Sequence, residues 1–162
     1  MLTLLCACFL LGSTATSSVQ SLSSSFSKEY GGGKGTPFSF SNDQRSGPIT
    51  AIRIREGPSF LNGIHFRYGN HWAPFSGGHS GSFHEFLLHS GENITQVSGK
   101  FDSYVNELVF VTSHGRIFKV GQSSGTSFND FPLFGGTVLR YISGRYSDVL
   151  NSIGFHWGFQ PR

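Results

Sequence analysis

The stretch Asn62-Gly63-Ile64-His65-Phe66 recurs along the chain in the form Asn-x-(Ile/Leu)-x-Phe. The second copy spans 106–110 and the third 151–155, at spacings of 44 (106 − 62) and 45 (151 − 106) residues. A unit of this length holds about four short strands, and three such units pack as sheets around one shared core. A propeller needs more blades of this size. The sequence therefore predicts an all-β fold, a closed β-prism with a pseudo-threefold repeat.

Composition also indicates short strands joined by tight turns. The chain has 22 Gly, 17 Phe and only 13% charged residues, whereas ordinary globular chains carry about 25% charge. Alternating, β-branched or aromatic segments predict strands at 52–55, 64–68 and 108–112. Because no stretch of ten residues has helical periodicity, we expect almost no helix.

Net charge and sequence motifs argue against several classes of function, namely nucleic-acid binding, catalysis and metal binding. A net charge of +3 and a pI near 9.1 permit an acidic partner, but no Lys/Arg cluster marks nucleic-acid binding. No phosphate loop appears, and we expect no enzyme; Glu85 and Glu107 remain open as an acid pair. No histidine forms a typical zinc spacing, so neither metal nor cofactor is expected. The seven histidines are at positions 65, 71, 79, 84, 89, 114 and 156.

The N-terminus predicts a secreted protein. The apolar run Leu2–Leu11, followed by small residues, is typical of a signal peptide, assigned to 1–17. Both cysteines, Cys6 and Cys8, fall inside it, so the mature chain is expected to contain no disulfide. We expect a flexible Ser-rich lead at 18–27, a first strand near Glu29, one domain at 28–162 and no transmembrane segment.

Several motifs, in order, resemble the jacalin-related lectins, and within them a secretory animal branch. These motifs are Glu29–Gly35, Gly47–Ala51, Val97–Lys100, Ser124–Phe128 and Ile142–Arg145. The resemblance implies a jacalin-type lectin domain, a β-prism of three Greek-key sheets with a shallow, metal-free sugar site at one end. It also implies secretion through secretory granules, and glycans or glycoproteins, mannose-type ones among them, as partners.

In this family the site combines a glycine-rich loop, a recognition loop and a binding loop. Glycines let backbone N–H groups approach a hydroxylated ligand, and a carboxylate accepts hydrogen bonds from two sugar hydroxyls. By resemblance the site residues are Gly31, Gly32 and Gly33 in the first loop, Lys100 and Asp102 in the second, and Ser147, Asp148, Val149, Leu150 and Asn151 in the third.

The binding loop departs from the family pattern at both defining positions, with Ser147 in place of Gly and Asn151 in place of Asp. An Asn amide has one carbonyl acceptor and no charge, which weakens the mannose-type interpretation. Asp148 is a candidate for a displaced carboxylate. A structural role for Asn151 is the alternative, because Asn62 and Asn106 occupy its place in the other repeats. For Gly31, Gly32 and Gly33, the alternative to a role in sugar binding is that they form a tight turn.

Two further functions stay open beside neutral-glycan binding. The first is binding of sulfated glycosaminoglycans by a granule-packaging protein, a second activity of the animal branch, with Lys34, Arg53 and Arg55 as candidates. The second is a lectin fold that has lost sugar binding. Separately, Asn93-Ile94-Thr95 is an N-glycosylation sequon, which makes Asn93 a predicted modification site.

Overall fold

The computed structural model describes residues 23–160, and in this range the chain is built from strands. The predicted signal peptide and both cysteines lie outside the described residues. The one helix among them is the short 3-10 helix η1 (Asp43–Ser46). The strands are β1 (Ser24–Gly31), β2 (Thr36–Ser39), β3 (Ile49–Glu56), β4 (Leu61–Tyr68), β5 (His71–Trp72), β6 (Ser76–Gly77), β7 (Ser82–Leu87), β8 (Ile94–Phe101), β9 (Val105–Thr112), β10 (Ile117–Gly121), β11 (Thr126–Asp130), β12 (Val138–Tyr146) and β13 (Leu150–Gly158).

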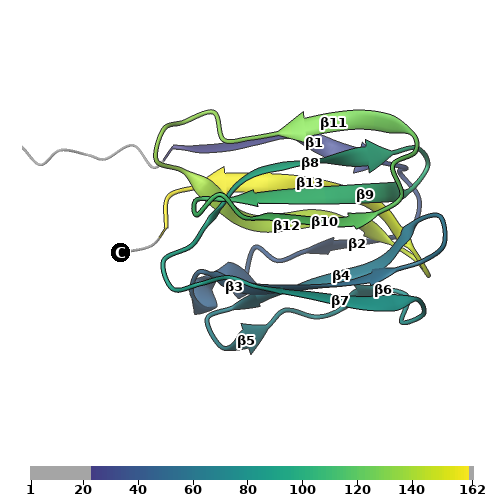
Figure 1. Cartoon of the computed structure of the whole chain (residues 1–162), viewed down its shortest axis with the longest axis horizontal. Helices are drawn as coiled ribbons and strands as arrows, with labels where there is room; N and C mark the ends of the chain where they lie inside the picture. Colours follow the sequence, from purple (N-terminus) through teal and green to yellow (C-terminus); the bar gives the residue numbers. More distant parts are fainter. Residues whose placement is uncertain (1–22, 161–162) are drawn as a thin grey trace, which may run out of the picture.

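The strands form three antiparallel sheets, as the repeat predicts (Figure 1). One sheet has the order β10-β9-β8-β11 and the second β5-β4-β3-β7, with β6 also paired to β4. The third, β1-β13-β12-β2, combines the first and the last strand of the described residues. Its pairing runs from Ser24 opposite Gly158 to Gly31 opposite Ser152. The three expected strands lie within β3, β4 and β9, so these predictions are confirmed.

Each sheet follows one plan. A central hairpin (β3–β4, β8–β9 or β12–β13) is flanked by an outer pair (β7 and β6, β11 and β10, or β2 and β1), and one short loop joins the two outer strands. This arrangement is the predicted Greek key. In Figure 1, β1 starts and β13 ends at the same end of the prism. The loops that join the outer strands therefore lie at the opposite end.

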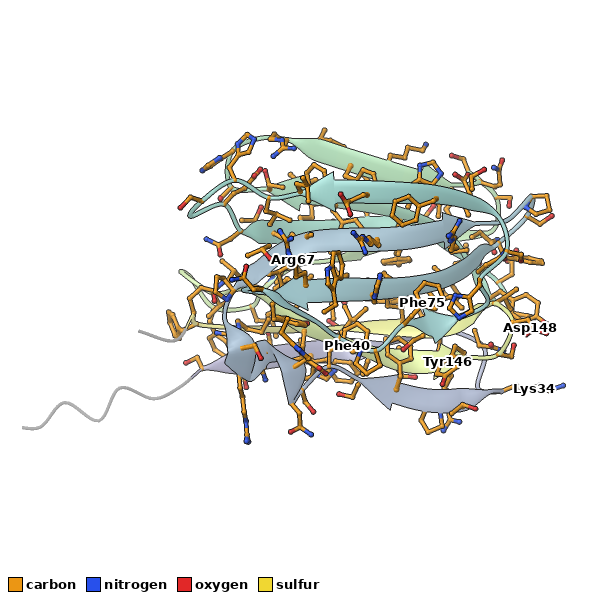
Figure 2. The ribbon with its side chains drawn as sticks, turned by 90° about the horizontal axis from the view of Figure 1, so that it is seen from below. Lys34, Phe40, Arg67, Phe75, Tyr146 and Asp148 are labelled. Atoms are coloured by element: carbon orange, nitrogen blue, oxygen red, sulfur yellow. The ribbon has the colours of Figure 1, made fainter. Side chains whose placement is uncertain are left out.

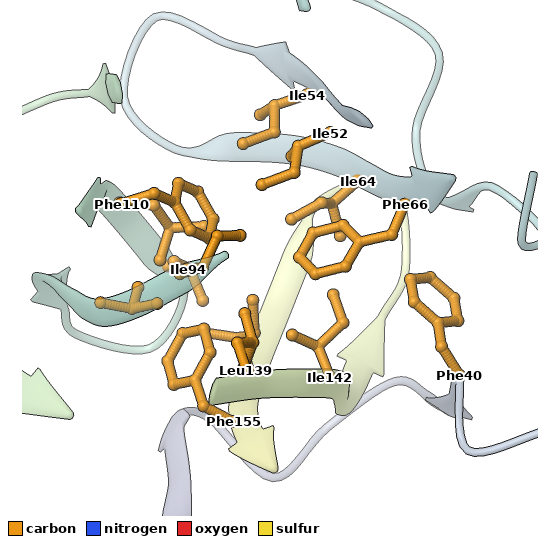
Figure 3. Packing of buried hydrophobic residues seen from close by; sticks show 14 of the residues in the cluster. Phe40, Ile52, Ile54, Ile64, Phe66, Ile94, Phe110, Leu139, Ile142 and Phe155 are labelled. Atoms are coloured by element: carbon orange, nitrogen blue, oxygen red, sulfur yellow. The ribbon is translucent and has the colours of Figure 1, made fainter. Parts of the chain in front are cut away.

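The repeated Asn-x-(Ile/Leu)-x-Phe motif forms the shared core. Its phenylalanines, Phe66, Phe110 and Phe155, are fully buried and come from three different sheets. Ile64, Leu108 and Ile153 of the same motif are also fully buried. Figure 3 shows Phe66, Phe110 and Phe155 around isoleucines from neighbouring strands. Because strand side chains alternate, residues two apart in the motif point into the same core.

A buried carboxylate links the sheet made by the chain ends to the β8–β11 sheet. Asp130 accepts hydrogen bonds from the Tyr30 hydroxyl at 2.8 Å and from the Trp157 indole N–H at 2.6 Å. Tyr30 also stacks on Phe128 with 4.2 Å between ring centroids. Burial, and then the nearby Asp130, raise the pKa of Tyr30. The phenol therefore stays protonated and donates its hydrogen bond to the buried carboxyl group of Asp130.

The first strand begins earlier than the expected start near Glu29. β1 includes Ser24–Ser27, the last residues of the expected flexible lead. The reason is a contact from the other end of the chain, since Phe26 stacks on His156 with ring centroids 4.3 Å apart. The predicted boundary between the signal peptide (1–17) and the Ser-rich lead stays a prediction. Among residues 23–160, no helix has the length and apolarity needed to cross a membrane.

Candidate functional site

Three similar loop pairs lie at the loop end of the prism. In each, the loop between the outer strands contacts the tip of the central hairpin of its own sheet. We name each corner by the asparagine that opens the second hairpin strand. The Asn151 corner joins 31–35 to 147–151, the Asn62 corner joins 77–81 to 57–62, and the Asn106 corner joins 121–125 to 102–106.

The outer loops share a Gly-x-x-x-Gly motif, and its first glycine is structural. A Cβ at this position would lie 2.1–2.2 Å from the backbone oxygen of the corner asparagine in all three corners, at Gly31, Gly77 and Gly121. The next N–H donates to the same oxygen, from Gly32 at 2.9 Å and from Gly78 and Gln122 at 2.8 Å. Gly31 therefore has the tight-turn role that the sequence left open.

The last glycine of the motif is also required by the backbone. Gly35, Gly81 and Gly125 have φ of +94°, +93° and +95°, where a side chain is strained. The motif thus repeats at 31, 77 and 121, and sequence reasoning missed it although the glycines are visible there. Gly33 differs from these glycines, because a Cβ on it would meet nothing within 4 Å.

Two of the corner asparagines hold their loops through the side-chain amide. Asn62 Nδ2 donates to the Ser80 carbonyl at 3.0 Å, and Asn106 Nδ2 donates to the Ser124 carbonyl at 2.9 Å. Both asparagines are buried. Their role is to close the turn, since each amide ties a carbonyl of the outer loop to the hairpin tip.

The Asn151 corner is built differently. Asn151 is equally buried, but its Oδ1 accepts a hydrogen bond from the Ser147 hydroxyl at 2.9 Å. Lys34 occupies the loop position that Ser80 and Ser124 hold elsewhere. No non-glycine residue among those described has positive φ, so Ser147 replaces the family's glycine without backbone strain. The side-chain carbonyl of Asn151 therefore already accepts a hydrogen bond before any ligand arrives.

The acidic residues of the hairpin tips also differ. Asp102 turns toward its own corner, where its Oδ2 accepts a hydrogen bond from Asn106 Nδ2 at 3.2 Å. Asp148 is exposed, and the structure gives its carboxylate no hydrogen bond or ion pair within residues 23–160. Figure 2 shows Asp148 and Lys34 at the same end of the molecule. The Asn151 corner thus carries an unengaged carboxylate.

Some of the other predicted site residues lie near the Asn151 corner, and others point away from it. The Ser103 carbonyl of the recognition loop lies against Gly32, 2.5 Å from where its Cβ would be. Lys100 points elsewhere, because its ammonium donates to Ser127 Oγ at 2.8 Å. In the binding loop, Val149 is half-buried and accepts the Ser147 N–H at 2.9 Å, while Leu150 is fully buried in the core.

The three cations considered for sulfated glycans are not equivalent. Arg53 pairs with Glu85 at 2.5 Å, and its guanidinium lies 4.0 Å from the centroid of the Trp72 ring. Arg55 donates to the Gly81 carbonyl at 3.2 Å. Lys34 is exposed and has no ion pair with the described residues. Two of the three cations are therefore engaged within the fold.

The acid pair left open by the sequence is split between sheets. Glu85 lies on β7, whereas Glu107 lies on β9 and pairs with Lys119 at 3.0 Å. Burial acts to raise the pKa of Glu107, but the Ser123 hydroxyl and then the Lys119 ammonium outweigh it and hold that pKa below its usual value. Each carboxylate therefore has its own cation, Arg53 for Glu85 and Lys119 for Glu107.

The sequon lies at the opposite end of the prism. Asn93 is half-buried before β8, its Nδ2 donates to the Gly91 carbonyl at 3.2 Å, and its Oδ1 accepts from Gln160 Nε2 at 2.8 Å. A glycan at this position would therefore stand away from the three corners. Glycosylation of Asn93 stays a prediction.

The Asn151 corner presents a small polar site that suits hydroxylated ligands. The Asp148 carboxylate and the exposed Ser147 side chain offer acceptors. The Gly33 N–H offers a donor, because within the described chain no acceptor reaches it. Open space next to Gly33 lets a ligand approach the backbone. The arrangement can therefore bind hydroxyl groups by hydrogen bonds alone.

Comparison with known proteins agrees with this architecture. Residues 27–156 match the family model of the jacalin-like lectin domain. The chain is 49% identical to zymogen granule membrane protein 16 of Rattus norvegicus over 99% of its own length and 93% of that protein, and 47% identical to the Homo sapiens protein of that name over 99% and 96%. The crystal structure of a prostate-specific WGA16 glycoprotein lectin aligns with a TM-score of 0.75 and 32% identity, over 85% of this chain and 100% of that one. The chain thus belongs to the jacalin-like lectin family.

Proposed function

We propose that this protein is a secreted lectin that binds neutral, mannose-type glycans at the Asn151 corner without a metal ion. Membership in a lectin family supports carbohydrate binding, and lectins are not enzymes. The corner supplies the groups that such binding needs, acceptors from Asp148 and Ser147 and a donor from Gly33. Because Ser147 and Asp148 are exposed to solvent, we expect weak affinity for a single sugar.

The observation that carries the proposal is the unengaged carboxylate of Asp148. The family pattern places an Asp at the position of Asn151, where this chain has a buried amide bonded to Ser147. Asp148 lies three residues earlier on the same hairpin tip and is exposed. A carboxylate accepts stronger hydrogen bonds than a neutral amide. Asp148 is therefore proposed to replace the missing acid.

A glycan array with neutral and sulfated panels tests this function. We expect signal on mannose-type glycans that Asp148→Ala removes and that salt leaves largely unchanged, since hydroxyl recognition needs no net charge on the ligand. Asp43→Ala, which changes an acid of η1, is the matched control and should keep the signal. Salt-sensitive signal on sulfated chains alone would support the polyanion function instead. Silence on both panels would support a lectin fold without sugar binding.

Secretion through granules is part of the same proposal. It is supported by the apolar run at the N-terminus and by the relatives named zymogen granule membrane protein 16. Expression of the full chain in a granule-forming cell line should deliver protein to the medium on stimulation, with a new N-terminus near Ser18. Retention of an uncut chain in the cells would contradict this part of the proposal and leave glycan binding untouched.

A further inference from the structure

A second cluster of functional side chains lies at the end of the prism opposite the corners. His89 and Glu92 belong to the loop between β7 and β8, and His114 belongs to the turn between β9 and β10. The two segments are joined by the Ser113 N–H, which donates to the Asn93 carbonyl at 2.8 Å. One ligand atom from each of the three side chains lies within 4.8 Å of the other two.

The carboxylate of this cluster is held in place before any ligand arrives. The Glu92 side chain has 0% exposure. Its Oε1 accepts from the Thr112 hydroxyl at 2.5 Å, and its Oε2 accepts from the His89 N–H at 2.7 Å and from Arg116 Nη1 at 2.8 Å. Such surrounding hydrogen bonds orient a metal-binding carboxylate and keep it ionised.

The two imidazoles complete a donor set for a transition metal. His89 and His114 are exposed, with 5.9 Å between their ring centroids. Two ring nitrogens and one carboxylate oxygen suit Zn²⁺, with water in the fourth position. Around a tetrahedral Zn²⁺, donors are about 3.4 Å apart. The present spread is larger, but the exposed His89 and His114 rings can rotate inward.

We propose that His89, Glu92 and His114 form a binding site for Zn²⁺ or a similar divalent transition metal. The site is independent of the sugar corner. Arg116 donates to the same carboxylate oxygen that faces His89, since His89 Nδ1 lies 3.8 Å from Glu92 Oε2. The metal therefore shares this oxygen with a cation, which makes the site weaker than a structural zinc centre.

Titration of ZnCl₂ into the untagged secreted protein by calorimetry tests the site, with MgCl₂ as the comparison ion. We expect one Zn²⁺ per chain and no binding of Mg²⁺, which prefers oxygen ligands. His89→Asn and His114→Asn should each weaken Zn²⁺ binding by at least about tenfold, because even changes around a metal ligand cost 10–100-fold. Both side chains are exposed, so we expect both variants to fold.

His71→Asn is the matched control, because His71 is an exposed histidine paired with a single carboxylate, Asp43, at 2.9 Å. It should leave Zn²⁺ affinity unchanged. The proposal is overturned if wild type binds Zn²⁺ no more tightly than His89→Asn or if His71→Asn weakens binding equally. As a second readout, NMR should show Zn²⁺ shifting the imidazole signals of His89 and His114 and leaving the signal of His71 in place.

Discussion

The Asn106 and Asn151 corners share one backbone plan but use their polar side chains differently. At the Asn106 corner, the amide donates to the Ser124 carbonyl and to Asp102, so the acid of the hairpin tip is bound inside the fold. At the Asn151 corner, the amide accepts from Ser147, and the acid Asp148 remains exposed. The difference is that only the Asn151 corner leaves the acid of its hairpin tip free for a ligand, and our proposed sugar site rests on this difference.

The shared backbone predicts the largest effect. Gly31→Ala and Gly121→Ala should each lower the free energy of unfolding by about 2–4 kcal/mol, because a Cβ would overlap a carbonyl oxygen at positive φ. Gly33→Ala, in the same loop as Gly31 but with open space around it, should change stability by less than about 0.5 kcal/mol. Urea unfolding of the three variants measures this contrast. A large loss for Gly33→Ala would mean that this loop is held differently.

Replacing the corner asparagine should affect stability differently at the two corners. Asn106→Ala should cost about 2 kcal/mol of unfolding free energy, since it removes two donated hydrogen bonds, one to the Ser124 carbonyl and one to Asp102. Asn151→Ala should cost about 1 kcal/mol, since it removes one bond from the exposed Ser147. Thermal unfolding by calorimetry ranks the two variants. Equal losses would contradict the proposed difference between the corners.

Restoring the family's acid should strengthen sugar binding. Ser147→Gly with Asn151→Asp replaces a neutral carbonyl, already bonded to Ser147, by a free carboxylate. We expect about tenfold tighter mannose binding, because hydrogen bonds to charged groups exceed neutral ones by about 1 kcal/mol or more. Isothermal titration with both proteins measures the gain, and Ser147→Gly alone is the control. Unchanged affinity in the double variant would show that Asn151 lies outside the sugar site.

Acid should loosen the Asn106 corner more than the Asn151 corner. The Glu107 carboxyl has a pKa below its usual value of 4.5 and binds Ser123 of the 121–125 loop. A carboxyl with a lowered pKa in the folded state stabilises the protein above about pH 4.5, and this contribution is lost as pH falls below that value. Thermal midpoints recorded from pH 6 to 3 should fall less steeply in Glu107→Gln than in wild type. Parallel curves would exclude this contribution.

Sequence predicted the fold because the decisive signal repeats and is local. Phe66, Phe110 and Phe155 fall at spacings of 44 and 45 residues and all enter the core. The start of β1 was expected too late, because a stack between Phe26 and His156 stabilises it from the far end of the chain. Such a contact has no local pattern in the sequence.

The site was predicted at the level of loops rather than side chains. Resemblance named the 31–35 and 147–151 loops, and these do meet in one corner. It also named Lys100 and Asp102, whose directions depend on cross-strand partners, Ser127 and Asn106. Those partners are known only once the strand register is known.

Mannose titration followed by NMR tests the central claim most directly. In wild type, we expect the amide signals of Gly33 and of Asp148 to shift together as mannose is added, because both are proposed to contact the sugar. Asp148→Asn should weaken binding about tenfold through the loss of a charged acceptor, whereas Asp102→Asn should leave binding unchanged. Binding that survives Asp148→Asn and fails in Asp102→Asn, or shifts confined to another corner, would contradict the account.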